Sequence, residues 1–397
     1  MSTFQLTFSA PLLTTDTDAL NAPMSSSTTD APPPVRTSRV GSVLHILLDR
    51  PRALNALNAE AVERLHDALE GAEKDENVAC ILIRGVGDRA FCAGGDVRAV
   101  HDMLARGDAN RAVTFFTREF ALNARLHALR KPSCCVWNGV VMGGGAGLSC
   151  YSPVRVATEK TTFAMPECQI GLYPDVGASW FLHELCGHAT AVYLSLTGAR
   201  VRGRECKSIG LATHYVELET WEREIVPKIE ELGLEAGVED LARVASSGET
   251  TTTTTTSEAV DSTTYATSAE GRRAIEEVFG DADMSLKDIR REMAQRAKNA
   301  SDVEEKKFFV AAADAVDKAS PTSLEVSLEL MRRARGKSLD WCLAMDSILI
   351  AKFIACDDFR RGVNSMLIKK TGAPPPEGWC PLAPSDALEF FSKDSKL

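Results

Sequence analysis

The chain has 397 residues, which is enough for one large domain or for a core domain with an added second part. Apolar residues make up 44% and charged residues 25%, as in ordinary globular proteins. A net charge of −10 argues against a nucleic-acid binder that works through bulk positive charge. No run approaches about eighteen consecutive apolar residues, so a membrane-spanning helix is excluded.

The cysteines favour free thiols over a disulfide framework or a zinc site. There are 11 of them, an odd number, scattered along the chain without a C-x-x-C pair. This pattern suits a reducing compartment.

Residues 1–39 are rich in Ser, Thr, Pro and Ala and show no regular apolar period. We interpret them as a disordered leader and expect order to begin at Ser42. The leader is a poor mitochondrial presequence, because it contains three aspartates and only two basic residues, Arg36 and Arg39.

Strands and helices alternate in the part that follows, residues 40–245. Asn58 is placed to cap a helix whose apolar positions Val62, Leu65 and Leu69 keep helical spacing. Strands separated by helices predict an α/β layered domain. The expected strands are Val43–Leu48, Val78–Ile83 and Cys134–Trp137, and a further expected helix is Phe115–Leu129.

Low-complexity sequence follows this core. Residues 246–270 include an unbroken threonine run, Thr250–Thr256, and almost no core-forming side chains, so we expect an exposed insertion. Residues 271–394 then predict a helical region, with Pro321 at one helix start and a strongly apolar stretch from Asp340 to Phe353.

Two familiar enzyme signatures are not supported. No G-x-S-x-G sequence occurs, which counts against an α/β-hydrolase. Gly85-Val86-Gly87 with Ala90 superficially matches a dinucleotide-binding fingerprint, but the sequence after it predicts more loop where the fingerprint requires a helix. Nicotinamide binding is therefore disfavoured.

Two glycine-rich segments are candidates for an oxyanion hole. Ala93-Gly94-Gly95-Asp96 lies between a strand and the expected helix Val97–Leu104, and Gly143–Gly147 follows the third strand. Glycine allows close approach of the backbone, and two such segments could direct N–H groups at one acyl oxygen. For either segment alone a tight turn is the simpler interpretation, whereas the pair favours function.

Two carboxylates follow in an apolar segment, Glu167 and, eight residues later, Asp175. An apolar environment raises the proton affinity of a carboxylate, which suits acid–base chemistry. The alternatives are that Glu167 caps a turn and that Asp175 caps the expected helix Val176–Leu185. On pattern alone Glu119 would belong to a solvated helix face.

These motifs together resemble the enoyl-CoA hydratase/isomerase (crotonase) superfamily. The resemblance rests on Phe91–Asp96, Met142–Gly145 and Ala164–Glu167, and it covers roughly residues 40 to 382. More narrowly, the chain is similar to the 3-hydroxyisobutyryl-CoA hydrolase branch in four further segments: Ala157–Lys160 through Tyr173–Gly177, Ser320–Leu324, Asp358–Val363 and Leu367–Lys370.

The resemblance implies an α/β fold built as a spiral of ββα units, with an appended C-terminal helical region. It also implies roles for six residues. The backbone N–H groups of Gly95 and Gly144 would form the oxyanion hole, Glu167 would be the nucleophile or base, and Asp175 would handle a proton or contact a substrate hydroxyl; Glu119, Asp96, Gly144, Glu167 and Asp175 would contact substrate.

The implied reaction is hydrolysis of the thioester of 3-hydroxyisobutyryl-CoA, or of a close short β-hydroxyacyl-CoA, in valine breakdown. Hydratases of the superfamily carry a second glutamate where this chain has Gly147, so hydrolysis is favoured over hydration or isomerisation. A non-catalytic acyl-CoA-binding protein is the remaining alternative. No metal or redox cofactor is implied, since CoA is part of the substrate.

The substrate and the chain terminus suggest further contacts. CoA is anionic, and candidates for a basic patch that would bind it are Arg50, Arg52, Arg98, Lys369 and Lys370. Ser395-Lys396-Leu397 matches a peroxisomal import signal, which predicts a peroxisomal import receptor as partner and a peroxisomal location, with the mitochondrion as alternative. Oligomeric state is left open.

Overall fold

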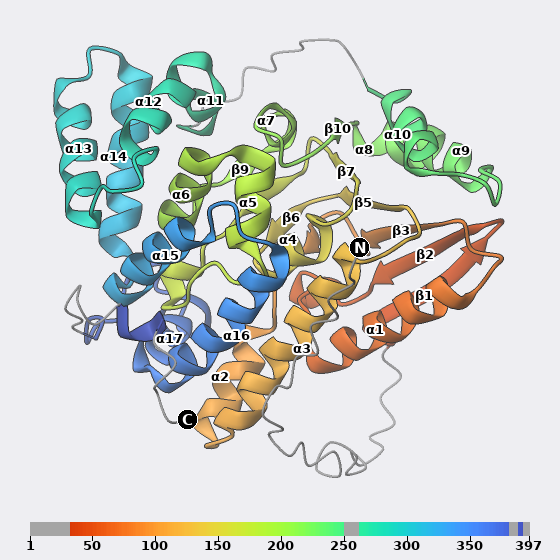
Figure 1. Cartoon of the computed structure of the whole chain (residues 1–397), viewed down its shortest axis with the longest axis horizontal. Coiled ribbons are helices and arrows are strands. Elements are labelled where there is room, and N and C mark those ends of the chain that lie inside the picture. Colours follow the sequence, from red (N-terminus) through yellow and green to blue (C-terminus); the bar gives the residue numbers. More distant parts are fainter. Residues whose placement is uncertain (1–31, 250–261, 381–387, 392–397) are drawn as a thin grey trace, which may run out of the picture. The chain divides into compact units, whose positions relative to one another are not determined.

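The strands of the computed structural model, which describes residues 32–249, 262–380 and 388–391, form two sheets (Figure 1). The larger sheet has the order β1-β2-β3-β5-β7-β10, and the smaller has the order β4-β6-β8-β9. The strands are β1 (Val35–Val40), β2 (Val43–Leu48), β3 (Cys80–Gly85), β4 (Ala90–Cys92), β5 (Ser133–Trp137), β6 (Val140–Met142), β7 (Val154–Ala157), β8 (Thr162–Ala164), β9 (Val201–Arg202) and β10 (His214–Tyr215).

From β3 to β8, consecutive strands alternate between the two sheets. In each of the pairs β3–β4, β5–β6 and β7–β8, the first strand joins the larger sheet and the second joins the smaller one, and a helical segment follows. Repeating this unit advances the chain by one position in both sheets, which produces the spiral of ββα units. The expected fold class is confirmed.

The smaller sheet explains why distant segments of the chain meet. Strands β4, β6 and β8 are neighbours and pair in parallel, so their carboxyl ends lie at one edge of the sheet. The segments that leave this edge begin at Ala93, Gly143 and Met165. They are the two glycine-rich segments and the segment that carries Glu167.

Order begins earlier than the sequence suggested. We expected a disordered leader through Arg39, but β1 pairs antiparallel with β2 along its whole length, from Val35 opposite Leu48 to Val40 opposite Val43. Val35 is buried, while the rest of β1 is exposed. One buried side chain gives almost no hydrophobic pattern in the sequence. The strand is held mainly by its backbone hydrogen bonds to β2. Residues 1–31 lie outside the described part.

Helices surround the two sheets. In the first two thirds of the chain they are η2 (Pro51–Ala53), α1 (Ala59–Lys74), α2 (Val97–Ala105), α3 (Ala109–His127), α4 (Gly144–Ser149), η3 (Glu167–Ile170), α5 (Ala178–Cys186), α6 (His188–Thr197), α7 (Gly203–Ser208), α8 (Leu218–Thr220), η4 (Trp221–Ile225), α9 (Val226–Glu230) and α10 (Val238–Ser246). No described helix has both the length and the apolar character needed to cross a bilayer.

The helical region is packed onto the α/β part. Helix α16 lies along α3, α15 packs against α5 and α6, and α17 packs against η3 (Figure 1). The described residues from Pro34 onward accordingly form one compact unit. Its elements are α11 (Ser262–Thr267), α12 (Ala269–Phe279), α13 (Leu286–Asn299), α14 (Val303–Lys318), α15 (Pro321–Ala334), α16 (Leu339–Ala355), α17 (Asp357–Val363), η5 (Asn364–Ile368) and η6 (Leu388–Phe391).

The expected insertion 246–270 is shorter than predicted at both ends. Ser246 is the last residue of α10, and α11 and the start of α12 lie inside the predicted range. Tyr265 packs on Phe308 of α14, with ring centroids 5.3 Å apart, so this end contributes to the core. The threonine run lies outside the described residues.

Several local predictions are confirmed. The side chain of Asn58 accepts a hydrogen bond from Ala61 N (2.8 Å) at the start of α1, as its cap position predicts. Strand Val43–Leu48 has the predicted bounds. The Gly85-Val86-Gly87 sequence is followed by strand β4 and not by a helix, which removes the dinucleotide-binding alternative.

Candidate active site

The two glycine-rich segments lie against each other at the edge of the smaller sheet. A Cβ atom built on Gly144 would lie 3.1 Å from Gly95 N, and one built on Gly94 would lie 3.4 Å from Gly144 N. Gly144 is the first residue of α4, so its N–H has no partner within that helix. Among the described residues, neither Gly95 N–H nor Gly144 N–H donates to an acceptor. Two free amide donors are thus brought together, as an oxyanion hole requires.

Glu167 lies directly beside these amides. A Cβ atom on Gly143 would lie 2.7 Å from Glu167 Oε1, so only glycine leaves room for the carboxyl. Glu167 is the first residue of η3, it is 5% exposed, and its Oε2 is buried without a hydrogen-bond partner. Apart from its own backbone N–H, this carboxyl has no hydrogen-bond partner among the described residues, so its Oε2 is available to a bound molecule.

Glu119 reaches the same point from α3. A Cβ atom on Gly144 would overlap Glu119 Oε1, and one on Gly95 would lie 3.4 Å from Glu119 Oε2. The residue is 1% exposed and its Oε1 has no partner among the described residues. Periodicity alone would have placed it on a solvated face, and this interpretation is wrong because the glycine segments cover its carboxyl.

Asp175 lies in the segment between η3 and α5 and is 4% exposed. Helix α5 begins at Ala178, with Gly177 at its cap position and no side-chain cap, so the alternative that Asp175 caps this helix is not supported. The next two residues both have positive φ, +53° at Val176 and +73° at Gly177. For a β-branched residue such as valine this conformation costs about 1–3 kcal/mol, which neighbouring contacts must offset.

Burial raises the pKa of all three carboxyls, and the charge of Asp175 adds to this rise at Glu119 and Glu167. Burial, and then the charge of Asp175, raise the pKa of Glu119 well above its usual value. The same two causes act in that order on the pKa of Glu167, with a smaller contribution from Glu119. Burial raises the pKa of Asp175 to about 7. A carboxyl with a pKa of about 7, as at Asp175, can exchange a proton with a substrate or a water molecule near neutral pH.

The position where hydratases carry their second glutamate is closed. A Cβ atom on Gly147 would lie 2.6 Å from Val176 Cβ and 3.0 Å from Asn123 Nδ2. Asn123 Nδ2 also donates to Gly147 O (3.0 Å). Val176 and Asn123 therefore occupy the space that a longer side chain at position 147 would need.

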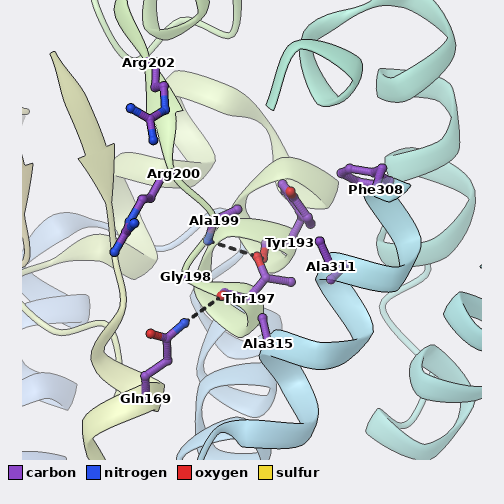
Figure 2. Close-up of a pocket in the computed structure, with 11 residues that line it drawn as sticks. Gln169, Tyr193, Thr197, Gly198, Ala199, Arg200, Arg202, Phe308, Ala311 and Ala315 are labelled. Carbon is purple, nitrogen blue, oxygen red and sulfur yellow. Dashed lines mark hydrogen bonds between the residues drawn. The ribbon is translucent and has the colours of Figure 1, made fainter. Parts of the chain in front are cut away.

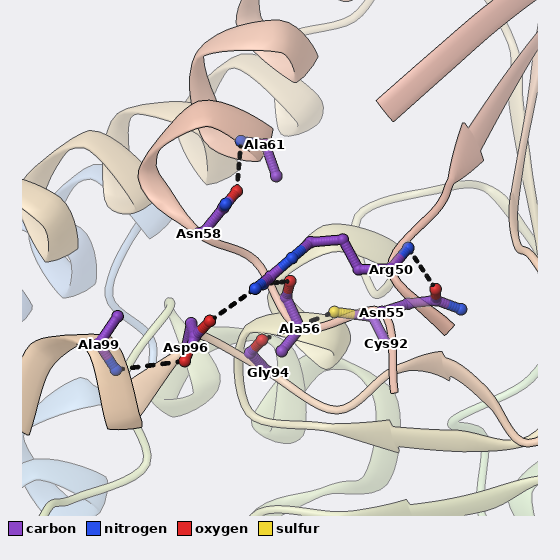
Figure 3. A network of polar contacts seen from close by, with 9 residues as sticks. All are labelled: Arg50, Asn55, Ala56, Asn58, Ala61, Cys92, Gly94, Asp96 and Ala99. Atoms are coloured by element: carbon purple, nitrogen blue, oxygen red, sulfur yellow. Dashed lines mark hydrogen bonds and ion pairs between the residues drawn. The ribbon is translucent and has the colours of Figure 1, made fainter. Parts of the chain in front are cut away.

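Asp96 has a structural position next to the site (Figure 3). Its Oδ1 accepts from Ala99 N (3.2 Å) at the start of α2, and its Oδ2 accepts from Arg50 Nη2 (2.9 Å). The backbone on either side is also held, because Leu57 N donates to Gly94 O and Asp96 N donates to Leu57 O, both at 2.8 Å. These bonds position the Gly94–Gly95 segment. They leave Asp96 outside the carboxyl cluster.

Two other features are separate from this cluster. A cavity of about 420 Å³ between α6 and α14 contains none of the predicted site residues (Figure 2); its lining includes Gln169, Tyr193, Arg200 and Phe308.

In the described part of the chain, the one group with metal-ligand spacing is Cys356, Asp358 and Cys380. Both oxygens of its carboxyl already accept hydrogen bonds, from Ser320 Oγ and Cys380 N.

Sequence reasoning missed the groups that hold the Asp175 segment. Tyr151 Oη donates to Val176 O (2.6 Å), Tyr173 Oη donates to Asp346 O (2.9 Å), and Gly177 N donates to Asp346 Oδ2 (2.8 Å). Asp346 lies within the apolar stretch of α16, and a carboxylate in the interior of such a stretch was the signal that could have identified it.

Comparisons with known proteins agree with this geometry. Residues 43–384 match the family described as enoyl-CoA hydratase/isomerase. A Danio rerio protein named "3-hydroxyisobutyryl-CoA hydrolase, mitochondrial" is 33% identical over 89% of this chain and 86% of that protein. The Gallus gallus protein of the same name is 33% identical over 91% of this chain and 88% of that protein. The crystal structure of an enoyl-CoA hydratase from Rhodobacter sphaeroides superimposes with a TM-score of 0.75 and 26% identity, covering 90% of this chain and 97% of that one.

Three observations support the same family: the fold, the paired glycine segments and the match over most of the chain. The chain belongs to the enoyl-CoA hydratase/isomerase family.

Proposed function

We propose that this chain hydrolyses the thioester of 3-hydroxyisobutyryl-CoA, or of a close short β-hydroxyacyl-CoA, to the free acid and CoA, and that it serves valine breakdown. The names of the relatives support this substrate. The observation that carries the proposal is the convergence of two free glycine amides with the buried carboxyls of Glu119 and Glu167, together with the closed position at Gly147. Asp175 is buried as well, and its charge acts on both of these carboxyls.

The amides of Gly95 and Gly144 would bind the thioester oxygen. Attack on the carbonyl carbon turns this oxygen into an oxyanion, and two fixed N–H donors in a buried site stabilise the charge as it develops. Loss of one such donor typically costs about 3–4 kcal/mol of barrier. No reorganisation is needed, because both donors are already oriented by the parallel strands that precede them.

Glu167 would start the reaction by one of two routes. Its ionised carboxylate attacks the carbonyl carbon, the C–S bond breaks, and the thiolate of CoA leaves and takes a proton; water then cleaves the resulting anhydride. Alternatively the carboxylate takes a proton from water, the hydroxide so formed attacks the carbonyl carbon, the C–S bond breaks, and the leaving thiolate of CoA takes up the proton. Both routes yield the acid and CoA. The raised pKa of Glu167 makes it a stronger base once ionised.

Asp175 would handle the second proton or contact the hydroxyl group of the acyl chain. The pKa of about 7 lets its carboxyl donate or accept a proton near neutral pH. Glu119, whose carboxyl adjoins both glycine segments, would contact the acyl group. Side chains and backbone amides of this chain would then supply all of the catalytic groups, with no added cofactor.

A basic patch would bind the phosphates of CoA near α2. Arg98 is exposed, and its guanidinium donates to Leu367 O (2.5 Å), which brings the end of η5 beside α2. Lys369 and Lys370 follow directly and are exposed. Arg50 is a weaker candidate than these three, since it pairs with Asp96 and donates to Ala56 O (2.6 Å).

The test is CoA release from 3-hydroxyisobutyryl-CoA by the wild type, by Glu167→Gln and by Glu184→Gln as a matched control, since Glu184 is exposed on α5. We expect Glu167→Gln to lower kcat by about 10²–10⁴-fold and the control to match the wild type. Unchanged turnover in Glu167→Gln would contradict the assigned role. Turnover in H₂¹⁸O separates the two routes, because only the anhydride route can place ¹⁸O in the Glu167 carboxyl.

We also propose that Ser395-Lys396-Leu397, which lies outside the described residues, directs the protein to the peroxisome through an import receptor. The mitochondrion is the alternative, and it is supported by the names of the relatives. Imaging of the tagged full-length chain with and without this tripeptide distinguishes the two. Loss of peroxisomal signal on deletion supports the proposal, whereas mitochondrial signal in both contradicts it.

A further inference from the structure

A buried carboxyl in the helical region contacts the Asp175 segment, and nothing in the proposed reaction uses it. Asp346 lies in the middle of α16 and is 0% exposed. Its neighbours in that helix are mostly apolar, and an aspartate is both a poor helix former and costly to bury. Its Oδ2 accepts a hydrogen bond from Gly177 N at 2.8 Å, while its Oδ1 is buried without a partner in the described part of the chain.

Asp346 contacts the segment on both sides of Asp175. Two residues before Asp175, the hydroxyl of Tyr173 donates to the backbone oxygen of Asp346 (2.9 Å). Two residues after it, Gly177 N donates to the Asp346 carboxyl. The carboxyl of Asp175 is thus carried by a short segment that is fastened at both ends to one residue of a different helix.

The conformation of the segment shows why it needs such fastening. Val176 and Gly177 both have positive φ, so the backbone is held in a region that valine rarely adopts. Gly177 is also covered by α16, because a Cβ atom there would lie 2.9 Å from Leu339 Cδ1 and 3.3 Å from Leu343 Cδ2. Gly177 N is the first free amide of α5, and in this buried position the Asp346 carboxyl is the group that satisfies it.

We propose that Asp346 is a positioning residue for Asp175: it accepts the Gly177 N–H and thereby holds the Tyr173–Gly177 segment in the conformation that directs the Asp175 carboxyl into the active site. This inference rests on the proposed function for its effect on catalysis. The hydrogen bond itself is a property of the fold and can be tested without turnover.

The experiment compares Asp346→Ala, which removes the acceptor, with Asp346→Asn, whose amide oxygen can still accept the Gly177 N–H. With 3-hydroxyisobutyryl-CoA we expect Asp346→Ala to lower kcat by about 10- to 100-fold, because a shift of about 1 Å in a reacting group has effects of this size. We expect KM to change much less and Asp346→Asn to recover most of kcat. Leu349→Ala, which removes a fully buried apolar side chain from the same helix, is the control for general destabilisation.

Hydrogen exchange of the peptide that contains Gly177 provides the second readout. In the wild type we expect its amide to be protected, and in Asp346→Ala, but not in Asp346→Asn or Leu349→Ala, to exchange about 10-fold faster or more. A wild type that does not release CoA would contradict the proposed function, and the exchange data would still test the positioning role. An unprotected Gly177 amide in the wild type would overturn that role, even if Asp346→Ala does not fold. Equal kcat in wild type and Asp346→Ala would also overturn it.

Discussion

A Cβ atom on Gly147 would lie 2.6 Å from the Cβ atom of Val176. This relationship joins two features that look independent in the sequence: the missing hydratase glutamate and the strained residue next to Asp175. Val176 has φ +53°, and in that conformation its side chain occupies the space beside α4. The residue that follows Asp175 therefore closes the position where hydratases of the superfamily carry their second glutamate.

The first prediction tests this contact by stability. Gly147→Ala should lower the free energy of unfolding by about 1–3 kcal/mol, because the added methyl group overpacks a buried site. Val176→Gly removes the opposing side chain, so the double variant should lose less than the sum of the single losses. Urea unfolding of the four proteins measures the interaction. Strict additivity would show that the two residues do not share this space.

The second prediction concerns the paired amides. Gly144→Ala should lower kcat for thioester cleavage by about 10²–10³-fold, which is the effect of losing one oxyanion donor. The added Cβ would overlap Glu119 Oε1 and displace either that carboxyl or the Gly144 amide. Adding Glu119→Ala would restore part of the stability but not the rate. A Gly144→Ala enzyme of normal activity would show that this amide does not bind the reacting oxygen.

The third prediction separates two roles for Asp96. Its carboxyl caps α2 and pairs with Arg50, so Asp96→Ala should cost about 1 kcal/mol of stability, in the range of a lost helix cap. If Asp96 bound substrate directly, as the family resemblance suggested, Asp96→Asn would raise KM by an order of magnitude, roughly the loss of one hydrogen bond to a charged group. We expect KM to remain close to that of the wild type. Steady-state kinetics and thermal unfolding of both variants decide between the roles.

The fourth prediction follows from the pKa of Asp175, which burial raises to about 7. An aspartate in the unfolded chain loses its proton near about pH 4, so between these values the folded state holds one more proton than the unfolded state. The stability from this group is fully present below about pH 4, falls by at most about 1.4 kcal/mol per pH unit, and is lost above the folded-state pKa.

In Asp175→Asn the side chain no longer titrates, so the folded state no longer binds this extra proton. The unfolding free energy of the wild type minus that of Asp175→Asn should therefore decrease from about pH 4 to 7 and level off above. Denaturant unfolding at several pH values measures the difference. A difference that is constant with pH would show that the Asp175 carboxyl has an ordinary pKa in the folded protein.

Much of the site could be predicted from the sequence because its glycines and carboxylates lie in compact motifs. The pairing of Gly95 with Gly144 and the position of Glu167 follow once three parallel strands end at one edge. Glu119 could be placed only by the family resemblance, since helical periodicity alone assigned it to solvent. Its burial depends on the two glycine segments, which the fold brings against this side chain of α3.

The sequence analysis also missed strand β1 and the role of Asp346, and both depend on contacts between residues far apart in the chain. Strand β1 was missed because it buries only Val35 and is defined by pairing with β2, which composition does not report. Asp346 was not predicted as a functional residue, because its partner is a backbone N–H. Gly177 N is available to donate to this carboxyl because of the positive φ angles at Val176 and Gly177, which the sequence pattern does not show. Long-range hydrogen bonds of this kind leave no periodic pattern in the sequence.

The most direct test of the central claim follows free-thiol release from 3-hydroxyisobutyryl-CoA and hydration of crotonyl-CoA in parallel, with the wild-type full-length chain. The convergence of both glycine amides with Glu167, the action of the Asp175 charge on that carboxyl, and the closure of position 147 by Val176 predict thiol release without hydration. Hydration without thiol release would contradict this assignment, because it would mean that the carboxyls of Glu119, Glu167 and Asp175 activate water toward a double bond even though position 147 carries no glutamate.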